Sequence, residues 1–301
     1  MNNFNKLIIG FAILLAISAS ASARTITVGH SPSADYWNIQ DAINSASNGD
    51  IIEVWYGTYS ENLIINKSVT LKSRDGVNMT FINGFGSGTV ITVTADNVTI
   101  SGFTIENADT GIKISSNNNV VKDNIIKNIK GTSCSKYCDG GSAYGIYLSS
   151  ATGNILSNNT VSSVSGGSGY YSSGSGYGIY LSSATNTTLT SNTIKSISNG
   201  GWCGVYGCYQ GDGYGIATVS NSNRNLIYHN NILSCSTKGG YDTSGGNAWD
   251  SGPIIGGNYW SDYSGVDANG DGFGDTPYEL GGSAGARDFY PFMKESGWVI
   301  N

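Results

Sequence analysis

The segment Asn154-Ile-Leu-Ser-Asn-Asn-Thr-Val-Ser-Ser-Val164 is the clearest indicator of the fold, because segments related to it recur along the chain. Three others align with it without gaps and begin at Asn119, Thr187 and Asn225, and a shorter fifth covers residues 100–108. Beside each segment lies a strand of the type Gly145-Ile-Tyr-Leu-Ser-Ser150. Units that cannot bury an apolar face alone must stack on one another. The sequence therefore predicts a solenoid.

The spacing of the repeats locates insertions in the coils. The aligned apolar residues are Ile100, Val121, Leu156, Leu189 and Ile227, spaced 21, 35, 33 and 38 residues apart. Insertions of 13, 11 and 15 residues before the Gly-Ile strand explain the longer spacings and leave coils of 22 or 23 residues. All three insertions fall at the same corner, so we expect them to stack into a continuous shelf along the solenoid.

Each coil also carries an asparagine at an inward position. These residues are Asn124, Asn159, Asn192 and Asn230, and Phe103 takes the place in the coil before them. An amide in every coil can bond to the amides above and below it, as in other ladders of stacked strands. We therefore expect a structural asparagine ladder inside the solenoid.

The same alignment separates the five cysteines. Cys235 falls in the inward column of Ile129, Val164 and Ile197, which predicts a buried free thiol. The remaining cysteines are Cys134 and Cys138 in one insertion and Cys203 and Cys208 in another. Each pair is expected to form a disulfide within its insertion, and pairing between insertions is the alternative.

The N-terminal region has the features of a secretory signal peptide over residues 1–23. Lys6 supplies the positive charge, an apolar core follows, and Ala21-Ser-Ala23 fits a cleavage site. No later apolar segment is long enough to cross a membrane. The net charge of −6 disfavours nucleic acid as a partner. Residues 35–47 have the pattern of a short amphipathic helix, which would plug the first coil.

The strands resemble those of a known family. The Gly-Ile-x-Leu-Ser-Ser and Asn-x-Ile strands are similar to those of pectin-lyase-like proteins, and of NosD-like proteins in particular. Residues 39–54 and 57–61 resemble the start of such solenoids, and residues 256–263, 275–278 and 290–291 resemble the C-terminal segment of NosD-like surface proteins, many of them archaeal. The resemblance implies an all-β fold, a right-handed parallel β-helix. It implies little about function, since this fold serves lyases, hydrolases, epimerases, adhesins and structural proteins.

The expected organisation follows from these observations. Residues 1–23 form the signal peptide, residues 24–255 the β-helix with its N-terminal capping helix, and residues 256–301 a C-terminal cap. Within this cap, the run from Asp267 to Asp275 spaces acidic or amide groups as in the start of a calcium loop. The expected ligands are Asp267, Asn269, Asp271, the carbonyl of Phe273, and Asp275. The twelfth position is Tyr278 and not Glu, so a full EF-hand is not matched.

Aromatic residues gather near the insertions and predict a binding surface. Tyr144, Tyr177 and Tyr214 precede the Gly-Ile strands, Tyr147 and Tyr180 point outward from them, and Trp202 and Tyr206 lie in an insertion. Aromatic rings beside polar groups suit sugar binding. The expected partner is a polysaccharide or a surface glycoprotein, although the rings could instead only pack the insertions onto the solenoid.

A catalytic function is the alternative. A lyase, hydrolase or epimerase needs convergent acids and bases, and the candidates are Asp139, Asp212 and His229. A third interpretation is a structural envelope protein that assembles with itself. No copper site is expected, because two His and three Met without clustering do not suit that metal. Glycan acceptors are expected among Asn66, Asn78, Asn97, Asn158 and Asn186, which begin Asn-x-Ser/Thr sequons. The sequence thus favours a secreted or cell-surface binding protein.

Overall fold

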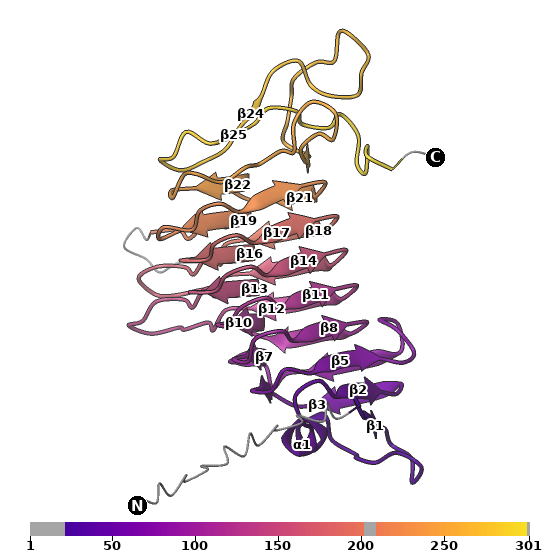
Figure 1. Ribbon diagram of the computed structural model, residues 1–301. Coiled ribbons are helices and arrows are strands. Elements are labelled where there is room, and N and C mark those ends of the chain that lie inside the picture. Colours follow the sequence, from indigo (N-terminus) through magenta and orange to yellow (C-terminus); the bar gives the residue numbers. More distant parts are fainter. Residues whose placement is uncertain (1–21, 202–208, 300–301) are drawn as a thin grey trace, which may run out of the picture.

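The computed structural model describes residues 22–201 and 209–299, which form a right-handed parallel β-helix (Figure 1). Three parallel sheets of eight, seven and eight strands run along the solenoid. The predicted fold is therefore confirmed. The predicted signal peptide lies almost entirely outside the described residues. Within the two described ranges, no helix has the length and apolar character needed to cross a membrane.

The strands of the three sheets alternate along the chain. The first sheet contains β1 (Thr25–Val28), β2 (Ile51–Val54), β5 (Thr70–Ser73), β8 (Thr99–Ser101), β11 (Val120–Lys122), β14 (Ile155–Ser157), β17 (Thr188–Thr190) and β20 (Leu226–Tyr228). The second contains β4 (Leu63–Ile65), β7 (Thr89–Val93), β10 (Thr110–Ile114), β13 (Ala143–Ser149), β16 (Gly176–Ser182), β19 (Gly213–Val219) and β22 (Lys238–Asp242). The third contains β3 (Gly57–Ser60), β6 (Thr80–Asn83), β9 (Thr104–Ala108), β12 (Ile125–Lys130), β15 (Thr160–Ser165), β18 (Thr193–Ser198), β21 (Asn231–Cys235) and β23 (Tyr259–Trp260). A short antiparallel pair, β24 (Tyr278–Glu279) and β25 (Arg287–Asp288), belongs to the C-terminal cap.

The register confirms the repeat alignment. The apolar residues that the sequence placed in one column, from Ile100 to Ile227, pair directly in successive strands of the first sheet. All of them are fully buried. Burying an aliphatic side chain contributes roughly 1.5–3 kcal/mol, so each stacked coil adds to a continuous core that no single coil could form.

Helix α1 (Ile39–Ser45) covers the N-terminal end of this core. Ile39, Ala42 and Ile43 are fully buried, and the helix contacts β1, β2 and β4. The predicted start at Asp35 is wrong, because the Asp35 carboxylate accepts hydrogen bonds from the backbone N–H and hydroxyl of Thr27. The helix starts instead where the Glu61 carboxylate accepts the N–H groups of Ile39 and Gln40.

The predicted asparagine ladder is present and runs in one direction. In Asn124, Asn159, Asn192 and Asn230, the backbone N–H and the side-chain Nδ2 donate to the Oδ1 of the asparagine in the next coil, at 2.9–3.2 Å. Asn258 extends the ladder by one coil. Asn258 in turn donates to the carboxylate of Asp288, where the ladder ends.

A second ladder was not predicted. Asn119 donates to Asn154, Asn225 donates to Asn247, and Asn247 donates to the buried carboxylate of Asp242. Thr187 occupies the coil between these pairs, so the side-chain amides are interrupted there. The signal was present in the sequence, because Asn119, Asn154, Thr187 and Asn225 head the aligned segments.

Candidate binding surface

The three insertions stack at the corner between the third and second sheets, as predicted (Figure 1). The segments between the flanking strands are residues 131–142, 166–175 and 199–212, of which the structure describes all but 202–208. Their backbones bond from coil to coil. The N–H of Cys134 donates to the carbonyl of Ser168, and the N–H of Ser173 donates to the carbonyl of Tyr209.

Glycine makes this close stacking feasible. A Cβ on Gly140 would collide with the carbonyl oxygen of Gly167, and one on Gly174 would collide with that of Gly141. Side chains in these positions would therefore push the backbones apart. The described parts of the insertions therefore form a closely packed layer.

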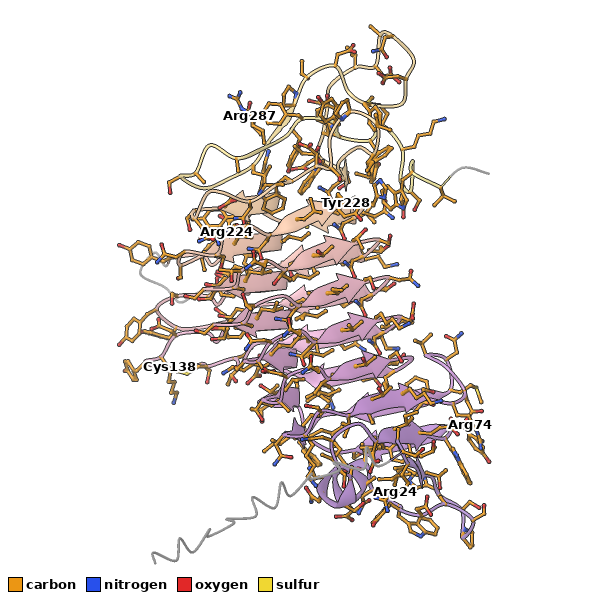
Figure 2. The ribbon with its side chains drawn as sticks, in the orientation of Figure 1. Arg24, Arg74, Cys138, Arg224, Tyr228 and Arg287 are labelled. Atoms are coloured by element: carbon orange, nitrogen blue, oxygen red, sulfur yellow. A yellow bond between two sulfur atoms is a disulfide. The ribbon has the colours of Figure 1, made fainter. Side chains whose placement is uncertain are left out.

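Four tyrosines lie near the ends of the insertions, and we call them the tip tyrosines: Tyr137, Tyr170, Tyr171 and Tyr209. Tyr137, Tyr171 and Tyr209 are exposed by 73, 53 and 87%. The rings of Tyr137 and Tyr170 lie 5.3 Å apart, and those of Tyr170 and Tyr171 are perpendicular at 5.1 Å. Figure 2 labels Cys138, next to Tyr137, on the side of the solenoid. The tip tyrosines thus offer aromatic surface to a partner.

The tyrosines predicted to bind have a different environment. Tyr144, Tyr177 and Tyr214 lie in successive strands of the second sheet and stack on one another, with centroids 5.2 and 6.1 Å apart. Tyr147 and Tyr180 contact the same stack. Much of the ring surface is therefore covered by other rings. Burial raises the pKa of Tyr180 to about 12 and also raises those of Tyr144 and Tyr177, so these phenols keep their protons near neutral pH.

The stack extends one coil further because of a small residue. Ala217 occupies the column of Tyr147 and Tyr180 and is fully buried. In the next coil Tyr241 follows Ala217, and its ring lies 4.4 Å from that of Tyr214. This stacked-tyrosine surface stabilises the sheet, and its tyrosines are less exposed than Tyr137 and Tyr171.

The described cysteines are paired or free as predicted, but Cys235 is partly and not fully buried. Cys134 and Cys138 form a disulfide within the first insertion. Cys235 is free, pairs in register with Ile197, and packs against the core. Burial raises the pKa of its thiol to about 12. The predicted Cys203–Cys208 bridge lies outside the described residues, and so do the proposed binding residues Trp202 and Tyr206.

The three catalytic candidates have different neighbours in the structure. Asp139 in the first insertion accepts a hydrogen bond from the Ser172 hydroxyl at 2.6 Å. Asp212 ends the third insertion, where its Oδ1 lies 3.5 Å from the Thr237 hydroxyl. His229 lies beside Tyr228, which Figure 2 labels near the C-terminal cap.

His229 has a structural environment. Its φ of 56° places it at the turn before the ladder residue Asn230, and Nε2 lies 2.7 Å from the carbonyl oxygen of Ile255. Its ring stacks on Trp298 with centroids 5.0 Å apart. His229 therefore connects the turn to the cap.

The acidic loop folds on its own backbone. Asp267 accepts the N–H groups of Gly270, Asp271 and Gly272, and Asp275 accepts that of Ala268. In the two described ranges, no group of three or more His, Cys, Asp or Glu side chains is arranged to hold a metal ion. Three backbone N–H groups thus already occupy part of the Asp267 carboxylate.

The expected glycan acceptors share one property. All five are exposed, and they are Asn66, Asn78, Asn97, Asn158 and Asn186. An acceptor must reach solvent to carry a bulky glycan, so the fold leaves each sequon available.

Several solved structures are similar to this one at low sequence identity, with TM-scores below 0.5. The alginate lyase from Paenibacillus sp. matches with a TM-score of 0.39 and 13% identity, over 75% of this chain and 99% of that one. The pectin methylesterase from Erwinia chrysanthemi matches with a TM-score of 0.44 and 16% identity, over 84 and 85% of the chains. The Dettilon tailspike protein matches with a TM-score of 0.45 and 14% identity, over 72 and 45%.

One curated relative is more similar in sequence. A cell surface glycoprotein of Methanothermus fervidus is 32% identical over an alignment 185 residues long, which covers 53% of this chain. The chain spans about 30% of the length of that relative.

A family model described as periplasmic copper-binding protein (NosD) matches residues 19–265. Copper binds clustered His, Met or Cys side chains. In this chain His30 packs between Trp37 and Tyr59 at the N-terminal end, whereas His229 bonds to the C-terminal cap. These described donors do not meet, so we derive no copper chemistry from them. The match covers most of the chain, and the protein belongs to the NosD family.

Proposed function

We propose that this protein is an extracellular cell-surface β-helix that binds a polysaccharide or a surface glycoprotein through the tip tyrosines. The observation that carries the proposal is the exposure of Tyr137, Tyr171 and Tyr209 by 73, 53 and 87% on closely stacked insertions. Exposed aromatic rings on a firm support suit the apolar face of a sugar ring. The similarity to a cell surface glycoprotein supports the location.

Binding should depend on the tip tyrosines. In a glycan array with the mature protein, the double variant Tyr137→Ser, Tyr171→Ser is expected to bind its best glycan about 10- to 100-fold more weakly, because two aromatic contacts are lost. Phe289→Ser is the matched control, since Phe289 is exposed by 53%, like Tyr171, but lies in the C-terminal cap. Equal affinity of the double variant and the control would contradict the proposal.

The state of the bound glycan distinguishes a binding protein from an enzyme or a structural protein. Mass analysis should recover it intact if the protein only binds. A cleaved or epimerised glycan would instead indicate an enzyme and direct mutagenesis to Asp139, Asp212 and His229. Ordered assembly of the protein with no glycan bound would favour a structural envelope component.

We also propose that the acidic loop, residues 267–275, binds calcium weakly. The side chains of Asp267, Asn269, Asp271 and Asp275, with the carbonyl of Phe273, supply the oxygen ligands that calcium prefers. The competing backbone hydrogen bonds of Asp267 and the absence of a closing glutamate favour a dissociation constant of about 1 mM, in the range of weak extracellular sites.

Calcium at 10-fold excess over that constant should raise the free energy of unfolding by about 1.4 kcal/mol. Calorimetric titration of wild-type protein should show uptake, and Asp271→Ala should abolish it. Glu279→Gln is the control, because Glu279 pairs with Arg287 at 2.9 Å outside the loop. No heat from the wild-type protein at millimolar calcium would rule out this site.

A further inference from the structure

Among the residues that the structure describes, Arg24 is the first whose backbone bonds to the rest of the fold. Its carbonyl accepts the N–H of Ile51 at 2.8 Å, and its own N–H donates to the Asp50 carboxylate at 2.9 Å. Strand β1 begins at the next residue and pairs with β2. Ser22 and Ala23, which precede Arg24, are exposed and lie outside any strand. The fold therefore begins at Arg24, which Figure 2 labels at the N-terminal end of the solenoid.

This boundary coincides with the cleavage site expected from the sequence. Ala21 and Ala23 are small residues at the third and first positions before Arg24, as the cleavage site of a signal peptide requires. That signature does not depend on the hydrogen bonds of Arg24, so two independent observations indicate the same peptide bond. Cleavage there leaves Arg24 as the first residue of the mature protein.

Asp50 is a buried carboxylate, exposed by only 6%. One of its oxygens accepts the N–H of Arg24, and the other accepts the N–H of Ser47, just after helix α1, at 2.9 Å. The guanidinium of Arg24 lies 3.6 Å from the carboxylate, beyond hydrogen-bonding distance, and donates instead to the carbonyl of Ser45. A buried charge needs a close partner of opposite charge. In the uncleaved chain the closer partner of Asp50 at Arg24 is a neutral amide.

We propose that cleavage between Ala23 and Arg24 stabilises the N-terminal end of the fold, because it gives Asp50 an ammonium partner. A signal peptidase splits the amide with water, Ala23 leaves with the new carboxylate, and both protons of the water end on the Arg24 nitrogen. This nitrogen already lies 2.9 Å from the Asp50 carboxylate, so a neutral donor becomes a charged one without movement of the chain. Charge-assisted hydrogen bonds are roughly twice as strong as neutral ones. The inference rests on the predicted signal peptide and is independent of the tip tyrosines.

The other charged groups near this pair are the same before and after cleavage. They are the guanidinium of Arg24, the carboxylate of Asp35, which accepts two bonds from Thr27 in β1, and the ammonium of Lys67, which donates to the carbonyl of Ala46 after α1. Their titration therefore cancels when two forms that differ only at the first residue are compared.

Two forms of the mature protein test the proposal, one that starts at Arg24 and one that starts at Ser22. Both carry an α-ammonium group, but in the second it lies two residues away from the nitrogen that bonds to Asp50. At pH 7 the melting temperature of the form that starts at Arg24 should be about 2–6 °C higher. An α-amino group in an unfolded chain has a pKa of about 8, and the ion pair holds its proton more tightly in the folded state. The difference should therefore be present at pH 7 and disappear by about pH 10.5.

Asp50→Asn is the matched variant, since it keeps the shape of the side chain and removes its charge. In this background the two forms should melt at the same temperature, and if the variant does not fold, the pH comparison of the unsubstituted forms decides. Equal melting temperatures of these two forms at pH 7 would overturn the proposal. A difference that persists at pH 10.5 would also overturn it, because residues 22 and 23 would then only crowd the fold. Mass analysis of the exported full chain should find Arg24 as its first residue, and any other first residue would contradict the proposal.

Discussion

Replacing Asn192 by leucine is expected to lower the free energy of unfolding by about 3–5 kcal/mol. Asn192 is fully buried in the middle of the first ladder. Its Oδ1 accepts two bonds from Asn159, and its Nδ2 donates to the carbonyl of Leu156 and to Asn230. Leucine has a similar volume, so little of the loss comes from a cavity. The cost arises because two N–H groups of Asn159 lose their acceptor while buried, and the carbonyl of Leu156 and the Oδ1 of Asn230 each lose a donor.

Urea unfolding followed by circular dichroism would measure this effect. Asn128→Ser is the matched control, because Asn128 is exposed and two other coils carry Ser163 and Ser196 at the equivalent position. The control should change stability by less than about 0.5 kcal/mol. A loss in Asn192→Leu no larger than that of the control would show that the ladder does not stabilise the fold.

The second large effect concerns pH and the residue that ends the first ladder. Asp288 is fully buried and accepts bonds from Asn258, the Trp260 indole and the N–H of Tyr290. Burial raises the pKa of its carboxyl to about 7, although these bonds favour the charged form. In the unfolded chain the pKa is about 3.9. The folded state therefore holds the proton more tightly between these values.

Stability should consequently fall as pH rises. The stabilisation linked to this proton is complete below about pH 4 and is lost as pH rises toward 7. Each unit by which the folded pKa exceeds the unfolded pKa corresponds to about 1.4 kcal/mol of stability. The wild-type protein should therefore lose about 2–4 kcal/mol of stability from this residue across that range. Asp288→Asn does not titrate and should lack this loss.

Unfolding of both proteins in urea from pH 4 to 8 would test this prediction, because their difference cancels the other titrating groups. Asp242, which ends the second ladder, behaves differently. Burial acts to raise the pKa of its carboxyl group, but its hydrogen bonds outweigh this effect and lower the pKa. If the difference between wild type and variant does not change with pH, the bonds at Asp288 hold its carboxylate ionised.

The sequence predicted the repetitive part of this molecule in detail. One alignment predicts the inward columns, the coil length, the corner that carries the insertions and the first ladder. This works because a residue in a stacked coil contacts the equivalent residues directly above and below it. The environment of Tyr144 and Tyr177 was harder to predict. Their rings repeat at the same position in successive coils. Each ring covers its neighbour because the strands lie close together, and the alignment does not show this distance.

The non-repetitive ends could not be predicted in the same way. Trp260 bonds to Asp288, 28 residues further on, and Trp249 bonds to Asp242 across a tight turn. The repeat alignment does not link such partners, because each pair occurs only once in the chain.

The one-way orientation of the ladder determines how this protein can change in length. Every ladder asparagine donates its backbone N–H and a side-chain N–H to the next coil toward the C-terminus. The last member therefore needs an acceptor beyond it, and the carboxyl group of Asp288 meets that need. A coil appended after Asn258 would separate Asp288, which ends the ladder, from the N–H groups that donate to it. A duplicated coil placed between Asn124 and Asn258 would bring its own asparagine and leave both ends intact. Variation in length among proteins built this way should therefore arise in the interior, and a designer who wishes to shorten or lengthen the solenoid should cut there.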